Sequence, residues 1–285
     1  MTVAQLWADR RSEVAFSGGR AGSGPATWGQ QAIWDVVRNL GTDAARYNVS
    51  GGLPLPSPVP AGRVEAAVRD LVLLHESLRT RLRTTGDGRV EQVVHAAGGI
   101  PLVTRAAGPD TVTPTAYALR DELLAVPFDA EREWPLRVGV VQAGGDAHYV
   151  VFFLSHTASD GWGLRNLLAD FAALLRGPLP ARDLLQPLEE AAFQTSERGR
   201  RRDAAARRSW RRSWAAARRA CSRRGRAGRR RPRSPTRCST PPRWAWPWTG
   251  SRARWRSAPP RSSSPRRPRR RPASPASARP SSRSW

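Results

Sequence analysis

The sequence predicts a mixed α/β domain, and three observations support that prediction. Strand-like and helix-like spacings of apolar residues alternate along the first 200 residues. The strand-like stretches 136–142 and 148–154 flank Ala-Gly-Gly-Asp, which is typical of a tight β-hairpin. After residue 203 the chain contains no Leu, Val, Ile or Phe from which a core could be built. We therefore expect a folded domain over 27–203, preceded by a flexible leader at 1–26 and followed by a disordered tail at 204–285.

Capping signals and periodicity predict the elements of the first half of this domain. Thr27 and Gln30 have the spacing of a capping box, and apolar residues recur at helical spacing up to Gly41. Pro60 opens a second helix, which ends near His75. The strands expected here have alternating or β-branched patterns and lie at 47–56, where the strand is short and leads into a turn, and at 78–84, 90–94 and 100–104.

The second half is centred on the hairpin. Before it, Thr113 and Pro114 predict the start of a helix. The second hairpin strand contains a continuous apolar run, so we expect it to be central and buried on both faces. After a loop, a strongly amphipathic helix ends at Gly177, and a last helix is expected from about Leu184 to Gln194.

Charge is divided unevenly along the chain. Residues 1–200 carry a net charge of −2, whereas residues 201–285 contain 28 arginines and one acid, Asp203. The two cysteines have no metal-binding spacing, so no metal site is expected. No apolar run could span a bilayer and no signal-peptide pattern is present, so we expect a cytoplasmic protein without membrane contact.

The composition of the tail indicates a change of reading frame. Residues 204–285 use only Ala, Arg, Ser, Trp, Cys, Gly, Pro and Thr. These are the residue types whose codons can carry G or C at the second position. A one-base slip in a GC-rich gene moves its third codon positions into the second and produces this alphabet. We therefore expect the tail to be out of frame, from a slip between Asp203 and about Trp214.

A second interpretation takes the tail as functional. Arginines interleaved with tryptophans and broken up by Ser and Pro are typical of segments that neutralise phosphates and stack on bases. Non-specific binding of nucleic acid through the tail is therefore the alternative expectation. It explains the charge and the aromatic residues, but it does not explain the complete absence of Lys, Gln, Asn and Leu.

The stretch SHTASDGWG, Ser155 to Gly163, is the candidate site. His156 follows a buried strand, and strand ends open onto clefts, where a neutral imidazole can take a proton from an attacking amine or hydroxyl. Asp160 and Gly161 stand where a helix begins, and an approachable backbone N–H there suits a developing oxyanion. The alternative is that Asp160 is only an N-cap and His156 a loop residue without a catalytic task.

With other motifs, this stretch resembles the condensation domains of nonribosomal peptide synthetases, in the chloramphenicol-acetyltransferase-like superfamily. Their hallmark is His-His-x-x-x-Asp-Gly, usually followed by Trp. Here Ser155 replaces the first histidine, while His156, Asp160, Gly161 and Trp162 match. Further stretches resemble family motifs in the same order along the chain: TWGQQAIW (27–34), HESLRTRL (75–82), PFDAEREWPLRV (127–138), EEAAFQ (189–194) and SWRRSW (209–214).

The resemblance implies a fold and a set of residue roles. The fold is the N-terminal half of a V-shaped pseudodimer, with the motif loop in a tunnel between the two halves. His156 would be the catalytic histidine, acting as base or as positioner of the acceptor amine, and Gly161 would contribute backbone to the oxyanion. Asp160 would hold the loop through an arginine, for which Arg137 is the candidate. His75 is expected to be structural.

The resemblance also implies the partners of the site. Acyl or peptidyl carrier proteins would act in trans and present thioesters on their phosphopantetheine arms, with no cofactor bound directly and no metal. An acceptor amine would attack the donor thioester to form an amide. The tunnel requires a second half, which the composition after residue 214 does not supply, so we expect the chain to be inactive or nearly so.

Three interpretations stay open at this point. The first is a condensation-type acyltransferase whose reading frame is broken. The second is a stand-alone ester- or amide-forming acyltransferase that acts as an oligomer. The third is a nucleic-acid-binding protein with a basic tail. The donor, the acceptor and the choice between amide and ester are open in each acyltransferase interpretation.

The frame hypothesis predicts the nucleotide sequence around codons 200–215. Reading the other frame from this point should give a Leu- and Val-rich globular sequence, because the Trp and Cys codons of the tail would then return to aliphatic ones. Sequencing of the locus and translation of both alternative frames checks this. A second frame without aliphatic residues would refute the hypothesis.

Overall fold

A computed structural model of the chain describes residues 10–227. The expected tail from residue 228 onward and the first nine residues of the expected leader lie outside the described residues. The chain divides into two units after Arg223, and of the second unit only the end of a helix, 224–227, is described. Between residues 10 and 227, no helix is both long enough and apolar enough to cross a bilayer.

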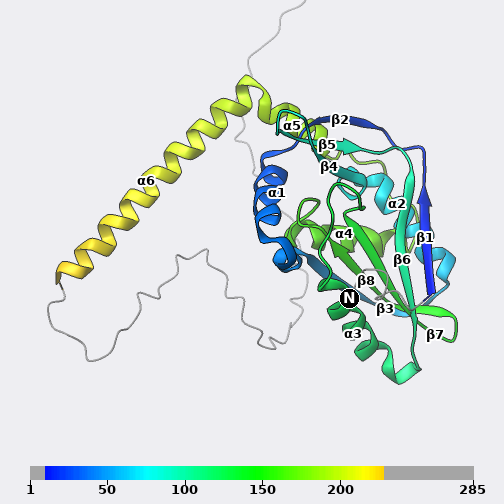
Figure 1. The fold of residues 1–285 in the computed structure, drawn as a ribbon. Coiled ribbons are helices and arrows are strands. Elements are labelled where there is room, and N and C mark those ends of the chain that lie inside the picture. The colour runs from blue at the N-terminus through cyan, green and yellow to red at the C-terminus, as the bar shows by residue number, and fades with distance from the viewer. Residues whose placement is uncertain (1–9, 228–285) are drawn as a thin grey trace, which may run out of the picture. The chain divides into compact units, whose positions relative to one another are not determined.

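The main sheet has five strands in the order β1-β6-β7-β8-β3 (Figure 1). Adjacent strands run antiparallel, except for the parallel pair β6 and β7. This mixed arrangement confirms the α/β class expected from the alternating patterns. The strands are β1 (Arg10–Phe16), β3 (Val49–Val59), β6 (Gly98–Ala106), β7 (Leu136–Ala143) and β8 (Asp146–Leu154).

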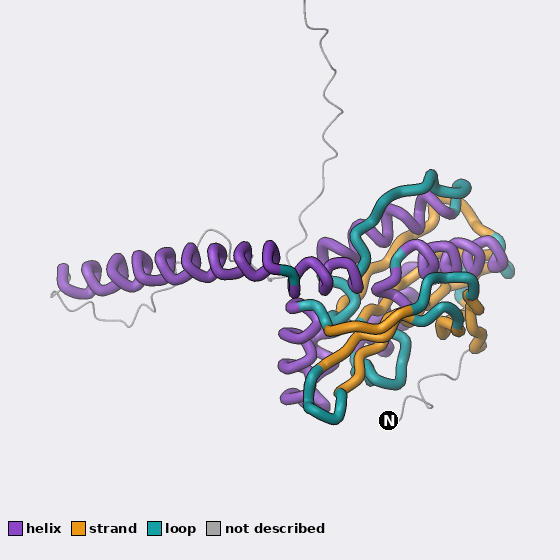
Figure 2. The backbone as a smooth tube through the Cα atoms, turned by 90° about the horizontal axis from the view of Figure 1, so that it is seen from above, coloured by secondary structure: helices purple, strands orange, loops and turns teal. Residues whose placement is uncertain are grey.

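Helices cover both faces of this sheet, so the strands lie in a middle layer (Figure 2). Helices α2 (Ala61–Leu74) and α4 (Gly161–Leu174) pack on one face, around Val150, Phe152 and Leu154 of β8. Helix α3 (Val112–Leu124) packs on the other face, around Val151 and Phe153. Because successive side chains of a strand point to opposite faces, β8 contributes to both core clusters.

A smaller sheet of three strands lies beside the first, in the order β2-β5-β4. Trp34 of α1 packs on it against Leu82 and Val90. The four elements of this part are β2 (Gly22–Pro25), α1 (Trp28–Leu40), β4 (Thr80–Thr84) and β5 (Val90–Val94). Helix α5 (Pro187–Thr195) contacts β2, and three short 3-10 turns complete the domain: η2 (Gly41–Tyr47), η3 (Glu76–Arg79) and η4 (Pro109–Thr111).

A tight turn and a close approach explain three glycines in the main sheet. The hairpin between β7 and β8 turns through Gly144 and Gly145, whose φ angles of 63° and 95° strain other residues, as the Gly-Gly signal indicated. On β3, a Cβ at Gly51 would lie 2.9 Å from Leu164 of α4. The missing side chain lets α4 pack directly on the strand, which brings the start of α4 close to the end of β8.

The predicted helices and strands are largely present, with shifted ends. The capping box of Thr27 and Gln30 starts α1, and both of its hydrogen bonds are formed. The strand expected within 47–56 is longer than predicted and runs to Val59 despite three prolines. β3 is an edge strand, and an edge strand tolerates prolines because one side of it needs no backbone partner.

The expected flexible leader at 1–26 is corrected over its second part. Residues 10–16 and 22–25 are strands that pair with β6 and β5. Of residues 11–16, only Val14 and Phe16 are buried, so the sequence pattern of this strand rests on two alternating apolar residues. The pairing comes from partner strands more than 60 residues away, which local patterns do not reveal.

The expected disorder of residues 204–285 is corrected over 204–227. These residues form the larger part of helix α6, which runs from Glu197 to Ala227. Ala and Arg are strong helix formers, and the helix contains no proline. Ion pairs one turn apart, Arg201 with Glu197 and Arg207 with Asp203, support its first half. Most described side chains of this helix after residue 200 are exposed, in agreement with the lack of core-forming residues.

A buried charge network fixes the turn after α2. The Glu76 side chain, only 5% exposed, accepts two hydrogen bonds from Arg20, at 2.9 and 3.1 Å, and one from Arg79 at 3.3 Å. Arg79 is 1% exposed and also donates to the carbonyls of Arg20 and His95. This network ties the leader, η3 and the end of β5 together.

Replacing Glu76 by Gln should therefore destabilise the fold strongly. The substitution leaves the buried Arg79 guanidinium without a counter-charge, which typically costs about 3–5 kcal/mol. Urea unfolding followed by circular dichroism measures the change. Glu91→Gln is the control, because its ion pair with Arg83 is exposed and should be worth less than about 1 kcal/mol. Equal losses in the two variants would show that burial of the network contributes nothing.

Candidate functional site

The candidate loop begins where β8 ends. Ser155 is buried, and its amide donates to the carbonyl of Pro135 at 3.0 Å, which extends the sheet by one bond. Its carbonyl accepts from the amide of Ala158 at 3.0 Å, and its hydroxyl lies 2.8 Å from that of Thr157. Ser155 therefore closes a tight turn whose outer positions are His156 and Thr157.

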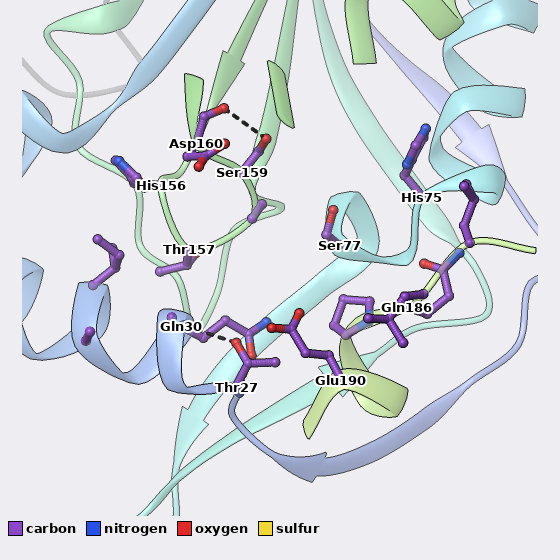
Figure 3. Close-up of a pocket in the computed structure, with 17 residues that line it drawn as sticks. Thr27, Gln30, His75, Ser77, His156, Thr157, Ser159, Asp160, Gln186 and Glu190 are labelled. Atoms are coloured by element: carbon purple, nitrogen blue, oxygen red, sulfur yellow. Dashed lines mark hydrogen bonds between the residues drawn. The ribbon is translucent and has the colours of Figure 1, made fainter. Parts of the chain in front are cut away.

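His156 lies on the wall of a cleft of about 620 Å³ (Figure 3). Its side chain is half-buried, and its ring lies 6.2 Å from the ring of Tyr47, measured between centroids. The imidazole is therefore reachable from solvent while one side of it rests on an aromatic neighbour. A histidine in this position can exchange protons with a molecule in the cleft.

Asp160 caps helix α4. Its Oδ1 accepts hydrogen bonds from the amides of Trp162, at 3.0 Å, and Gly163, at 2.8 Å. Within residues 10–227, no hydrogen bond to the amide of Gly161 is formed, and Gly161 is exposed. The capping role given to Asp160 as the alternative expectation is thus present, while the Gly161 amide stays available at the positive end of the helix.

Arg137 does not hold Asp160, which corrects the expected pairing. Arg137 donates to the carbonyls of Val126 and Pro127 and to Glu133 at 2.6 Å, and it stacks on Phe128. The reason is the pleat of β7. Arg137 pairs in register with Phe153 and so faces the α3 side of the sheet, whereas α4, which Asp160 caps, packs on the opposite side.

The start of α1 and the start of α5 contribute further sides of the cleft (Figure 3). Gln30 of α1 donates to the buried Gln92 at 3.2 Å, and Gln92 in turn donates to the carbonyls of Pro25 and Pro187. Gln186 bonds to the amide of Glu76 and the carbonyl of Leu74, both at 3.0 Å. These amide side chains hold three distant segments around one opening.

His75 lies across the cleft from His156 (Figure 3). Its Nε2 is 2.9 Å from Asp170 of α4, and the other oxygen of Asp170 pairs with Arg182. Burial lowers the pKa of His75, the Asp170 carboxylate opposes that fall, and the Arg182 charge adds to it. This hydrogen bond joins the end of α2 to α4, which supports the structural role expected for His75.

Sequence reasoning missed part of the cleft wall. Gln30 was recognised only as a capping residue, and Gln186 and Glu190 were not singled out. Gln186 and Glu189 form a capping box at the start of α5, a signal that was present in the sequence. That signal predicts a helix start, but it does not show which cleft the helix start faces.

Comparison with known proteins links this arrangement to one kind of domain. The family model described as Condensation domain matches residues 21–185. The chain is 32% identical over 148 residues to a probable non-canonical nonribosomal peptide synthetase, CymA, of Salinispora arenicola, and 29% identical over 153 residues to tyrocidine synthase 3 of Brevibacillus parabrevis. These alignments cover 52% and 54% of this chain but only 2% of each synthetase.

Solved structures show the same fold. The condensation domain of the monacolin K polyketide synthase MokA has a TM-score of 0.51 at 20% identity, covering 61% of this chain and 38% of that one. The complex of the X-domain and OxyB from teicoplanin biosynthesis has a TM-score of 0.51 at 25% identity, covering 62% of this chain and 39% of that one. This chain therefore spans well under half the length of either structure.

The half-buried His75 predicts a pH dependence of stability. Its folded-state pKa lies below the ordinary value of about 6.5, so the unfolded chain binds the proton more tightly. Above about pH 6.5, His75 is neutral in both states and the free energy of unfolding has its full value. It should fall as the pH drops toward the lower folded-state pKa, because the unfolded chain then takes up the proton first.

Urea unfolding between pH 7.5 and 5 measures this slope, and His75→Gln should flatten it. His95, whose pKa burial also lowers, contributes to the same slope, so some dependence should persist in the variant. A slope unchanged in His75→Gln would contradict the assignment.

Proposed function

This chain belongs to the condensation-domain family, and on that premise we propose that it is the N-terminal part of an amide-forming acyltransferase. Two features of the geometry support the proposal. A half-buried histidine lines an open cleft, and the amide end of α4 begins five residues later on the same loop. Acyl transfer to an amine requires a proton acceptor near the nucleophile and a donor near the carbonyl oxygen.

His156 is the proposed catalytic residue. The acceptor amine attacks the thioester carbonyl, a C–N bond forms, and the C–S bond breaks as the thiolate leaves. His156 either takes the proton released by the amine or holds the amine in place for attack. The Gly161 amide donates to the oxygen that becomes negative, and Asp160 keeps that helix end in position through its two cap bonds.

The proposed partners are acyl and peptidyl carrier proteins acting in trans. Their phosphopantetheine arms supply the thioesters when they enter the cleft. An open cleft of about 620 Å³ is large enough to admit such an extended arm.

We further propose that the chain as written works poorly because residues 204–285 are out of frame. The described residues supply only the N-terminal half of the two-lobed tunnel that the family resemblance implies, and catalysis by positioning depends on holding both substrates. Supplied with an acyl-carrier and an aminoacyl-carrier, the chain should form amide far more slowly than typical enzymes, whose turnover is about 10 s⁻¹. Mass spectrometry of the carrier-bound product measures the rate. Product at an ordinary enzymatic rate would overturn this expectation.

A version with the alternative frame restored tests the role of His156. Amide formation should appear in that version and should fall by about 10²–10⁴ in His156→Gln, because a general base typically contributes this much. The same assay on carrier-bound product checks it. His148→Gln is the matched control, since this histidine lies on β8 outside the cleft. A His156 variant within a factor of about three of its parent would exclude the proposed role, which requires a loss of at least 10².

Helix α6 favours nucleic acid as a second, separate partner. Trp210 and Trp214 lie one turn apart with ring centroids 5.8 Å apart and planes 24° from parallel, and both are more than half exposed. Arg207, Arg211 and Arg218 are exposed on the same helix. Exposed rings beside guanidinium groups suit stacking on bases and pairing with phosphates. Binding of single-stranded DNA that weakens with salt and disappears in a chain ending at residue 203 would support this.

A further inference from the structure

A second pocket of about 510 Å³ lies away from the cleft and is strongly basic. It is formed between β1 and β6 of the main sheet, β4 of the smaller sheet and the segment leading into β7. No residue is shared with the lining of the cleft. Four arginines and two glutamates line it, which leaves an excess of positive charge.

The arginines of this pocket differ in how they are paired. Arg137 is neutralised by Glu133 at 2.6 Å. The Arg81 side chain, in contrast, has no hydrogen bond or ion pair with any described residue, and its Nε is buried without a partner. Burial alone lowers the pKa of Arg81, and no carboxylate opposes that fall. A partly buried guanidinium without a counter-ion is unfavourable, so an anion entering the pocket would relieve this cost.

Packing holds Arg81 in place rather than leaving it mobile. Its guanidinium lies 3.8 Å from the centroid of the Trp134 ring, and Trp134 makes an edge contact with His95 at 5.2 Å. The indole rests on the backbone at Gly98, where a Cβ would overlap the ring. The charge is therefore presented in a fixed position, as anion recognition requires.

Arg132 supplies a second unpaired charge. It is exposed, lines the same pocket, and its side chain makes no ion pair with the residues from 10 to 227. Its backbone amide is fixed by Asp129, which anchors the segment that carries it. Two guanidinium groups at one pocket offer several N–H donors, which an oxyanion with several acceptor oxygens can use and a single halide ion cannot.

We propose that this pocket is an oxyanion site that binds a phosphate group through Arg81 and Arg132. The excess positive charge favours a dianion, so a phosphate monoester or free phosphate should bind more tightly than a carboxylate. The site is independent of the acyl-transfer cleft and of the function proposed for it. It marks this face of the domain as a place where a phosphate-bearing small molecule or side chain binds.

The test follows the Arg81 guanidinium itself, because the arginine-rich remainder of the chain also attracts anions. In the full ¹⁵N-labelled chain, the buried Nε–H of Arg81 gives a signal that is assigned by its loss in Arg81→Lys. Inorganic phosphate is titrated at constant ionic strength and pH 8, with sodium chloride as the reference salt. The signal should shift and saturate with phosphate.

Variants separate the site from general charge effects. Arg132→Gln should weaken the apparent affinity about tenfold, the typical value of a charge-assisted hydrogen bond. Arg83→Gln is the matched control, because Arg83 lies two residues after Arg81 on β4 but is paired with Glu91. The affinity of this variant for phosphate should equal that of the parent chain. Arg132 is exposed, so its replacement tests the site even if Arg81→Lys fails to fold. In that case the Arg81 Nε–H signal is assigned through the contact of Arg81 with the Trp134 ring.

Each outcome decides the proposal. A shift that stays linear in phosphate, or an equal loss in the Arg83 and Arg132 variants, would overturn it. Tighter binding of acetate or succinate than of phosphate would also overturn it. Glycerol phosphate and a phosphoserine peptide as further titrants distinguish a free metabolite from a phosphorylated chain as the source of the group.

Discussion

The structure depends on the burial of strand β8 on both faces. Val150, Phe152 and Leu154 fill the core under α2 and α4, and Val151 and Phe153 fill the core under α3. The buried part of this strand, from Val150 to Leu154, leaves no room for unpaired polar side chains, so the polar groups of the loop follow where it stops. Ser155 closes the turn at that point, and α4 returns over β3 at Gly51. His156 reaches the cleft because the last core residue, Leu154, lies two positions before it.

The pleat of the sheet also separates the cleft around His156 from the basic pocket at Arg81. Arg137 faces the α3 side and contributes to the oxyanion pocket, although its sequence neighbourhood resembles a motif of the condensation family. Asp160 serves the other side by capping α4. The alternation of side chains along β7 places Arg137 on the face of the sheet away from α4, so it cannot serve the loop that Asp160 caps. The cleft around His156 is held by the caps of α4 and α5, by amide side chains and by the contact of His75 with Asp170.

Much of the domain could be predicted from the sequence because its signals are local. The capping box at Thr27, the Gly-Gly hairpin and the apolar run of β8 each specify an element through nearby residues. Strand β1 was missed because its stability comes from pairing with β6, and helix α6 was missed because the absence of core residues was taken to mean absence of helix.

The site shows the same dependence on local sequence signals. His156 and Asp160 share one loop and were found together, whereas Gln186 joins the cleft through contacts with residues about 110 positions earlier. No local pattern encodes such a contact.

The central claim is that the cleft lined by His156 receives a pantetheine-bound acyl group within reach of the His156 ring. Covalent capture tests this most directly. The full chain, with Cys221 and Cys238 replaced by Ser, is incubated with chloroacetyl-pantetheine, and the alkylated residue is mapped by mass spectrometry. The account predicts alkylation of His156 in preference to His75, His95 and His148, and competition by unreactive acetyl-pantetheine. Labelling spread over the four histidines, or a His156 that stays unmodified while another histidine reacts, would contradict it.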